Sequence, residues 1–206
     1  VGNNIQMHQV GYAPSSFYVY QQVYDQEGRP MEGVYVDRDE NGVINADDKY
    51  FFHKPAADFT MGLNTTLTYK NWTLAASGHG SLGNYIYNNV ASDGEMLADL
   101  WTNSFTSNRL ESALWSNFNQ ACYLSDYYIK DASFFKVDNV TLGYTFPSLF
   151  KSAKLDRALG LNIYATVQNV ATITNYEGLD PEVFSGIDNN LYPRPRTYIL
   201  GVKFNF

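Results

Sequence analysis

The chain ends in the stretch RTYILGVKFNF, residues 196–206, whose pattern decides the fold class. Every second residue of this stretch, counted back from the end, is apolar: Phe206, Phe204, Val202, Leu200 and Tyr198. The residues between them are mostly polar or small. Alternation with a period of two predicts a β-strand that has one apolar face and one polar face.

The same alternation recurs earlier in the chain and predicts four further strands. They cover residues 59–69, 72–81, 139–146 and 161–168. Only Lys70 and Asn71 separate the first two, which predicts a hairpin with a tight turn. Residues 16–24 are a sixth candidate, whose alternation is less regular. We therefore predict an all-β fold with five or six antiparallel strands.

Three features favour a transmembrane β-barrel over a soluble β-sandwich, whose strands also alternate. The strands run to about ten residues, whereas the average strand has about five or six. Aromatic residues lie near the strand ends, as in Tyr69 with Trp72. The connections include a two-residue turn and long loops around 82–126 and 174–196. Short turns on one side, long loops on the other and aromatic girdles are typical of an antiparallel transmembrane β-barrel.

In such a barrel the apolar face meets lipid, and the face rich in Thr, Asn and Gly meets the lumen. Lys136 and Asp138 share the apolar parity of their strand, so we expect them at its outer end, beyond the hydrocarbon. Five or six strands are too few to close a barrel, because the known range begins at about eight strands. Open edges in lipid would leave backbone groups unpaired. We therefore expect the chain to be a segment that pairs with the rest of the same barrel.

The composition argues against several function classes. Of the 206 residues 17% are charged, the net charge is −7 and the sequence pI is about 4.8. This acidic balance argues against a nucleic-acid partner, which needs a basic face, and suits a surface that holds cations. Cys122 is alone, so the chain has no intrachain disulfide and no cysteine-based zinc site. No apolar run of about 18 residues predicts a transmembrane helix, and we expect no signal peptide at Val1.

Five stretches of the sequence resemble one known family in their order and spacing. They are VGYAPSSFYVYQ (10–21), DRDENGVINADDK (37–49), SDYYIKDASFFKVDNVTLGYTFP (125–147), YATVQNVATITNYEGLDPEV (164–183) and LYPRPRTYILGVKFNF (191–206). The last three resemble the C-terminal signature of the SusC/RagA-like TonB-dependent transporters. The resemblance covers nearly the whole chain.

The resemblance implies a barrel of about 22 strands with an N-terminal plug, in the outer membrane of a Gram-negative, Bacteroidetes-type bacterium. Residues 1–206 would then be the C-terminal segment of the barrel domain, its last five or six strands, without the plug. The implied function is TonB-dependent import of a glycan or an oligopeptide, with a SusD-like surface lipoprotein as a lid. The implied partners also include the TonB complex, reached through the missing N-terminal part, and outer-membrane lipid. The alternative is a soluble, calcium-stabilised β-sandwich module that binds surface glycans.

The terminal strand has a further implied role in biogenesis. In outer-membrane barrels a terminal aromatic residue on an alternating strand resembles the signal read by the assembly machinery. The residues concerned here are Phe206, Phe204 and Tyr198. Ordinary sheet burial explains the alternation but not the end on Phe206.

The stretch DRDENGVINADD has the spacing of a calcium-binding loop. Its candidate ligands, at positions 1, 3, 5, 7, 9 and 12 of the loop, are Asp37, Asp39, Asn41, Val43, Asn45 and Asp48. Calcium takes six to eight oxygen ligands, and Gly42 would allow the sharp turn that brings the Val43 carbonyl round. Position 12 is Asp rather than the longer, bidentate Glu. The alternative is a solvated turn rich in Asp and Asn.

The long loops carry aromatic side chains that are candidates to stack on sugars or peptides, or to contact the lid. They are Tyr85, Tyr87, Trp101, Trp115, Tyr123, Tyr127 and Tyr128. The alternative for each is packing inside a long loop. We expect no catalytic residues, because no motif supports a nucleophile with its base, and Asp131 and Asp138 alone do not define a glycosidase pair. The three histidines lack metal-ligand spacing, and His79 is predicted at the lumen or the rim.

Overall fold

The computed structural model describes residues 5–100, 109–120, 122–151, 158–189 and 191–205. The chain divides into two compact units. The strand unit comprises residues 59–82, 134–174 and 192–206, and the loop unit comprises residues 1–58, 83–133 and 175–191. Each unit is described by itself.

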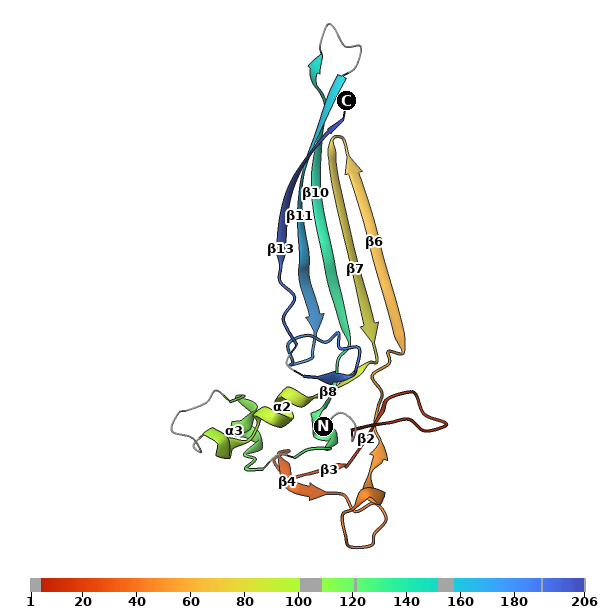
Figure 1. Cartoon of the computed structure of the whole chain (residues 1–206), viewed down its shortest axis with the longest axis vertical. Helices are drawn as coiled ribbons and strands as arrows, with labels where there is room; N and C mark the ends of the chain where they lie inside the picture. The colour runs from red at the N-terminus through yellow and green to blue at the C-terminus, as the bar shows by residue number, and fades with distance from the viewer. Residues whose placement is uncertain (1–4, 101–108, 121, 152–157, 190, 206) are drawn as a thin grey trace. The chain divides into compact units, whose positions relative to one another are not determined.

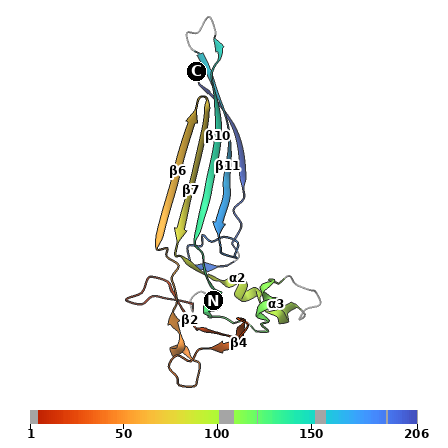
Figure 2. The ribbon, with the colours of Figure 1, turned by 180° about the vertical axis from the view of Figure 1, so that it is seen from behind.

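The strand unit is one antiparallel sheet in the order β13-β11-β10-β7-β6, drawn in Figure 1 and from behind in Figure 2. Its strands are β6 (Phe59–Tyr69), β7 (Trp72–Leu82), β10 (Phe134–Lys151), β11 (Ala158–Thr174) and β13 (Thr197–Asn205). All five predicted strands are therefore confirmed. β10 and β11 are longer than predicted, with 18 and 17 residues, because each extends beyond both ends of the predicted stretch.

The register aligns apolar residues in rows across the sheet. One row joins Leu67, Leu74, Leu142, Ala165 and Leu200. The next row towards the tight turn joins Tyr69, Trp72, Tyr144, Ile163 and Val202. Several members of both rows are exposed large apolar side chains, so one face of the sheet is an apolar surface with an aromatic band. This is the face that the alternation assigns to lipid.

The opposite face is polar, and its side chains bond across strands. Thr141 and Thr166 hydroxyls lie 2.8 Å apart, and Asn162 Nδ2 donates to the Thr145 hydroxyl at 2.8 Å. Hydrogen bonds between facing Thr and Asn side chains are a normal form of cross-strand stabilisation. The two faces thus differ as the sequence predicts.

A β-bulge interrupts the alternation of β10 at Asp138. Val137 pairs with Gly78 and Asn139 pairs with Ser77, so Asp138 is an extra residue without its own partner in β7. An extra residue in one strand moves the side chains of all earlier residues of that strand to the opposite face of the sheet. Lys136 therefore lies on the polar face, opposite His79. The expectation that Lys136 and Asp138 lie on the apolar face is therefore wrong.

The strand unit does not have the buried inner face of a soluble sandwich. All 11 residues of β6 are exposed, on both faces of the strand. A sandwich strand instead buries every second side chain against the facing sheet. No helix among the described residues is long and apolar enough to cross a membrane.

The loop unit is built from short elements. They are β1 (Gln6–Met7), β2 (Ser16–Val19), β3 (Gln22–Tyr24), β4 (Pro30–Tyr35), η1 (Ala46–Asp48), β5 (Tyr50–Phe51), β8 (Tyr85–Asn88), α2 (Asn89–Gly94), η2 (Leu97–Leu100), α3 (Ser112–Ser116), η3 (Asp126–Tyr128), β9 (Ile129–Asp131) and β12 (Ile187–Asp188). Residues 16–24, the sixth strand candidate, form β2 and β3 here. They pair with β1, β5 and β4, so this stretch is not a strand of the barrel sheet.

The loop unit has a hydrophobic core of its own. Its largest buried side chains include Phe17, Tyr87, Phe118 and Tyr128. These residues come from the first segment of the chain and from the 83–133 connection, so packing joins parts that are distant in sequence. The long connections are therefore a folded unit rather than extended loops.

Candidate functional site

The long connections leave from one end of the sheet. Phe59 pairs with Leu82, and Phe134 pairs with both Ser81 and Thr174, so the strand ends that lead into the loop unit are neighbours in the register. At the other end, β6 and β7 are joined by a two-residue turn. Since binding residues are disproportionately carried by loops on a rigid scaffold, candidate sites are sought first in the loop unit.

The predicted calcium loop brings three carboxylates together. One oxygen from each of Asp37, Asp39 and Asp48 lies within 4.8 Å of the others. Asp48 is fully buried and Asp39 is exposed. Gly42 has φ +82°, a conformation that favours glycine and allows the predicted sharp turn.

Hydrogen bonds within the loop hold these carboxylates in place. Asp48 Oδ1 accepts from the Arg38 backbone N–H at 2.8 Å and Oδ2 accepts from the Asn45 N–H at 2.7 Å. The N–H of Asn45 is the main cause that lowers the pKa of Asp48, so this buried carboxyl is ionised at neutral pH. Asp37 Oδ2 accepts from the Gly42 N–H at 2.7 Å.

The other predicted ligands are partly used within the loop. Asn41 Oδ1 accepts from the Val43 N–H at 2.8 Å. Asn45 Oδ1 accepts from the Asp47 N–H at 2.7 Å and caps η1. Each amide oxygen has a second lone pair, so the donor set of carboxylate, amide and carbonyl oxygens fits a hard cation such as calcium.

The loop aromatics separate into buried and exposed groups. Tyr87 and Tyr128 are 0% and 1% exposed, so packing inside the loop unit is favoured for these two over ligand contact. Tyr85 and Tyr127 are half-buried against the same core. Trp115 on α3 is 54% exposed and is free to meet another molecule. Trp101 lies outside the described residues.

The polar face of the sheet carries a charged cluster that the alternation missed. His79 Nδ1 lies 2.8 Å from Asp138 Oδ2, and the His79 ring packs edge-on against Phe134. The Lys136 ammonium lies 5.3 Å from the centroid of the Phe134 ring. The bulge at Asp138 makes this grouping possible, because it brings Lys136 and Asp138 to the polar face beside His79.

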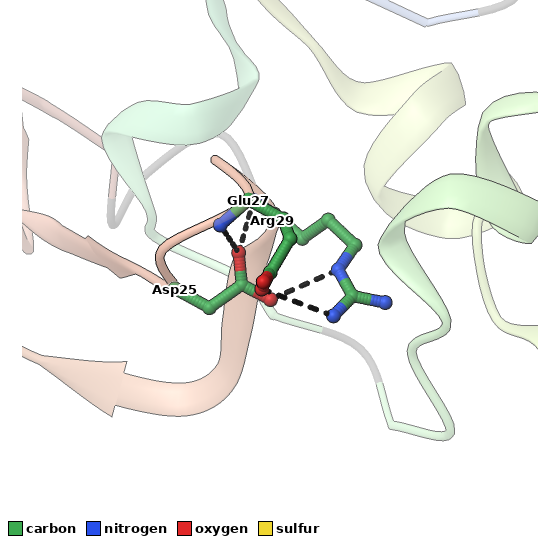
Figure 3. A network of polar contacts seen from close by, with 3 residues as sticks. All are labelled: Asp25, Glu27 and Arg29. Atoms are coloured by element: carbon green, nitrogen blue, oxygen red, sulfur yellow. Dashed lines mark hydrogen bonds and ion pairs between the residues drawn. The ribbon is translucent and has the colours of Figure 1, made fainter.

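The turn between β3 and β4 holds the ion pairs drawn in Figure 3. Arg29 Nε lies 2.9 Å from Asp25 Oδ2, and Arg29 Nη2 lies 3.5 Å from Glu27 Oε2. The Asp25 carboxylate also accepts from the Arg29 backbone N–H at 2.7 Å, which lowers the pKa of Asp25. These contacts tie the turn to itself, which indicates a structural role.

In the terminal strand the register places two of the three predicted assembly residues. Tyr198 and Phe204 both project from the apolar face of β13 and are exposed. Phe206 lies outside the described residues. The exposure of this edge strand's apolar face matches that of the other strands.

A sheet with one apolar face and one polar face, whose long connections fold into a unit of their own, defines a segment of a membrane β-barrel. No family model matches the chain. Over 210 residues it is 47% identical to the TonB-dependent receptor SusC of Bacteroides thetaiotaomicron, covering all of this chain and 21% of SusC. It is 29% identical over 199 residues to the TonB-dependent receptor P3 of Formosa agariphila, covering 86% of this chain and 19% of P3.

Solved structures of similar fold agree with these relatives. The RagAB peptide importer in its closed-closed state superposes with a TM-score of 0.74 at 23% identity, covering all of this chain and 24% of that chain. The chain belongs to the SusC/RagA-like TonB-dependent receptors, whose barrels span the outer membrane. It spans about a fifth of the length of the curated relatives it matches.

Proposed function

We propose that this chain is part of a transporter that imports a nutrient, a glycan or an oligopeptide, across the outer membrane. The 47% identity to SusC across the whole chain carries the proposal. TonB would supply the energy through parts of the protein outside this chain, and a SusD-like lipoprotein would cover the loops. In this proposal the chain performs no catalysis. It contributes a wall of the pore and the folded loops that meet the nutrient and the lid.

The direct test is loss of uptake in the bacterium that carries the gene. Deleting the gene should abolish growth on one class of polymeric nutrient, and inactivating TonB should have the same effect. Oligosaccharide and oligopeptide fractions supplied separately would identify the class. Equal growth of the deletion strain on every fraction would contradict the import function.

A second test separates the wall from the loops. Replacing residues 83–133 by a short turn should impair uptake or lid association, because it removes β8, α2 and β9 from the loop unit. The strand unit keeps its five strands in this variant, so an assembled barrel should still form. Loss of assembly in this variant would show that residues 83–133 serve the barrel itself.

We also propose that the loop at residues 37–48 binds one calcium ion. The three carboxylates within 4.8 Å of one another support it, since such a group is relieved by a cation. Asp37, Asp39 and Asp48 would supply carboxylate ligands. The Asn41 and Asn45 amides and the Val43 carbonyl would supply further oxygens. The ion would be structural and hold the loop closed.

Calcium bound per full-length protein, measured by calorimetry, tests this site. The double variant Asp37→Asn and Asp39→Asn should bind one ion fewer than the wild type. Asp47→Asn is the matched control, because Asp47 lies in the same loop outside the cluster and should leave the count unchanged. An unchanged count in the double variant would eliminate the site.

We further propose that Phe206, with Phe204 and Tyr198, forms the signal for barrel assembly. Changing Phe206 to Lys should lower the amount of protein in the outer membrane while the assembled remainder transports normally. Normal amounts with normal assembly kinetics would refute this role.

A further inference from the structure

The loop unit contains a pocket that the sequence patterns do not indicate. Its volume is about 430 Å³, within the range of small-ligand sites. Four aliphatic side chains contribute to its lining: Val90, Leu110, Leu179 and Leu191. Two carboxylates, Glu177 and Asp188, also line it, and no Lys, Arg or His is among its described lining residues. The pocket is therefore apolar and acidic at the same time.

Asp188 is the unusual member of this lining. It lies on β12, which runs parallel to β8 and pairs Asp188 with Asn88. The residue is 1% exposed, and its Oδ2 accepts a hydrogen bond from the Tyr176 hydroxyl at 2.9 Å. Its Oδ1 has no hydrogen-bond partner in the described part of the chain. A buried carboxylate with one unsatisfied oxygen requires an explanation, because burying it costs free energy.

Tyr176 is fixed in the role of donor to this carboxylate. Burial, together with the nearby charge of Asp188, raises the pKa of Tyr176, so its hydroxyl keeps its proton at physiological pH. Gly178 allows the chain to fold over the Tyr176 ring. A Cβ on Gly178 would lie far inside van der Waals contact with that ring, so a larger residue there would displace the ring from its present position. The local sequence is therefore built to hold Asp188 in this pocket.

The electrostatics of the pocket select for a positive charge. Attraction between opposite charges is several times stronger inside a protein than in water, because the effective dielectric constant is lower. Glu177 adds a second negative charge at the exposed part of the lining. Calcium takes six to eight oxygen ligands, and the aliphatic side chains of the lining offer none. They favour an organic group over a metal ion.

We propose that this pocket binds an organic ammonium ion carried on a short apolar chain. Lysine side chains and the amino termini of peptides have this chemistry, and neutral sugars do not. The inference deepens and rests on the proposed import function, because it points to an amine-bearing, peptide-like nutrient. The aliphatic side chains contact the apolar chain, and the carboxylate of Asp188 compensates the ammonium.

Calorimetry on the full-length transporter in detergent tests the pocket. The probes are n-pentylammonium, its neutral isostere n-pentanol, and calcium. Asp188→Asn keeps one oxygen that can accept from Tyr176, removes the negative charge and replaces the other oxygen by an NH2 group. It should weaken n-pentylammonium binding at least about tenfold and leave any n-pentanol binding unchanged. Glu27→Gln, an exposed acid of the loop unit outside the pocket, is the matched control and should bind as the wild type does.

Three outcomes would overturn the proposal. They are equal n-pentylammonium affinity in Asp188→Asn and wild type, n-pentanol binding as tight as that of n-pentylammonium, and displacement of n-pentylammonium by calcium. Circular dichroism and thermal unfolding of each variant identify any loss of fold. Binding by Asp188→Glu, which restores the charge in a longer side chain, keeps the proposal testable if Asn misfolds. Failure here would leave the import function standing, because uptake is measured separately.

Discussion

The strand unit and the loop unit use apolar residues in opposite ways. In β6 every residue is exposed, including Leu63 and Leu67, whereas in the loop unit Phe17 and Tyr87 are fully buried. The strand unit holds its strands by backbone pairing and leaves its apolar face for the membrane. The loop unit buries its apolar side chains against one another, as a water-exposed domain does. The apolar side chains of the strand unit therefore depend on lipid to be shielded from water, whereas those of the loop unit shield one another.

This difference predicts where a new charge is tolerated. An arginine on the apolar face of the sheet must enter hydrocarbon, whereas one on the polar face meets the lumen. Because side chains alternate between the two faces along each strand, residues in neighbouring rows of the sheet lie at nearly the same depth but on opposite faces. An arginine at one of them is therefore a matched control for an arginine at the other. The comparison can therefore be tested most strongly in the sheet.

The largest effect is expected for Leu142→Arg. Leu142 lies on the apolar face, in the row that also contains Leu74. A charge near the bilayer midplane costs about 2–4 kcal/mol. The variant should be depleted from the outer membrane, as measured by the amount of folded barrel in purified membranes. Thr66→Arg is the control, since Thr66 belongs to the adjacent row on the polar face and is exposed. Depletion of Thr66→Arg with normal Leu142→Arg would reverse the assignment of the faces.

Close packing matters at the bulge of the strand unit. A Cβ on Gly78 would lie 2.5 Å from the Lys136 carbonyl oxygen, a backbone atom that has little room to move. Gly78→Ala should therefore destabilise the barrel by about 1–3 kcal/mol, seen as a lower unfolding temperature in detergent. Gly62→Ala on β6 is the control, because nothing lies within 4 Å of its added Cβ. Equal unfolding temperatures for the two variants would show that the bulge adapts freely.

The strand unit was predictable because its pattern is local. Alternation over residues 59–69 or 197–205 is visible without knowing any partner strand, and it gave the strands and their faces. The bulge at Asp138 was not predictable from alternation, because an extra residue becomes visible only when β10 is paired with β7. As a result Lys136 was placed on the wrong face. The register, rather than the composition of β10, decides where its charges point.

The loop unit was predicted much less well because its contacts are non-local. Its core joins Phe17 to Tyr87 and Tyr128, which are far apart in sequence and follow no period. The sequence therefore left open whether the tyrosines bind ligands or pack. The predicted calcium loop could be recognised from the sequence because its spacing is a local motif. The structure brings Asp37, Asp39 and Asp48 together. Asp188 carried no motif, and only its burial and pairing make it stand out.

The smallest expected effect concerns a buried acid in the loop unit, Glu95. It follows α2, is nearly fully buried, and its Oε2 has no hydrogen-bond partner in the described part of the chain. Burial raises the pKa of Glu95, and Glu177 acts in the same direction. Hydrogen bonds from Ser112 and Tyr128 and the charge of Lys130 oppose the rise. Because the raised pKa favours the protonated form, folding of this unit should be sensitive to pH.

The sign follows from comparing the two states of this carboxyl. Below its ordinary pKa of 4.5, Glu95 is protonated both folded and unfolded, so the burial of this carboxyl costs the unit least stability there. As pH rises past this value the unfolded form ionises first, and stability falls until the folded pKa is passed. Glu95→Gln should therefore leave protection from hydrogen exchange in β8 unchanged at pH 4 and increase it at pH 7, after correction for intrinsic rates. Glu111→Gln, an exposed acid before α3, should show no such difference between the two pH values. Equal protection of wild type and Glu95→Gln at pH 7 would mean that contacts within the folded loop unit compensate the ionised Glu95 carboxylate, and that its burial does not limit the stability of this unit.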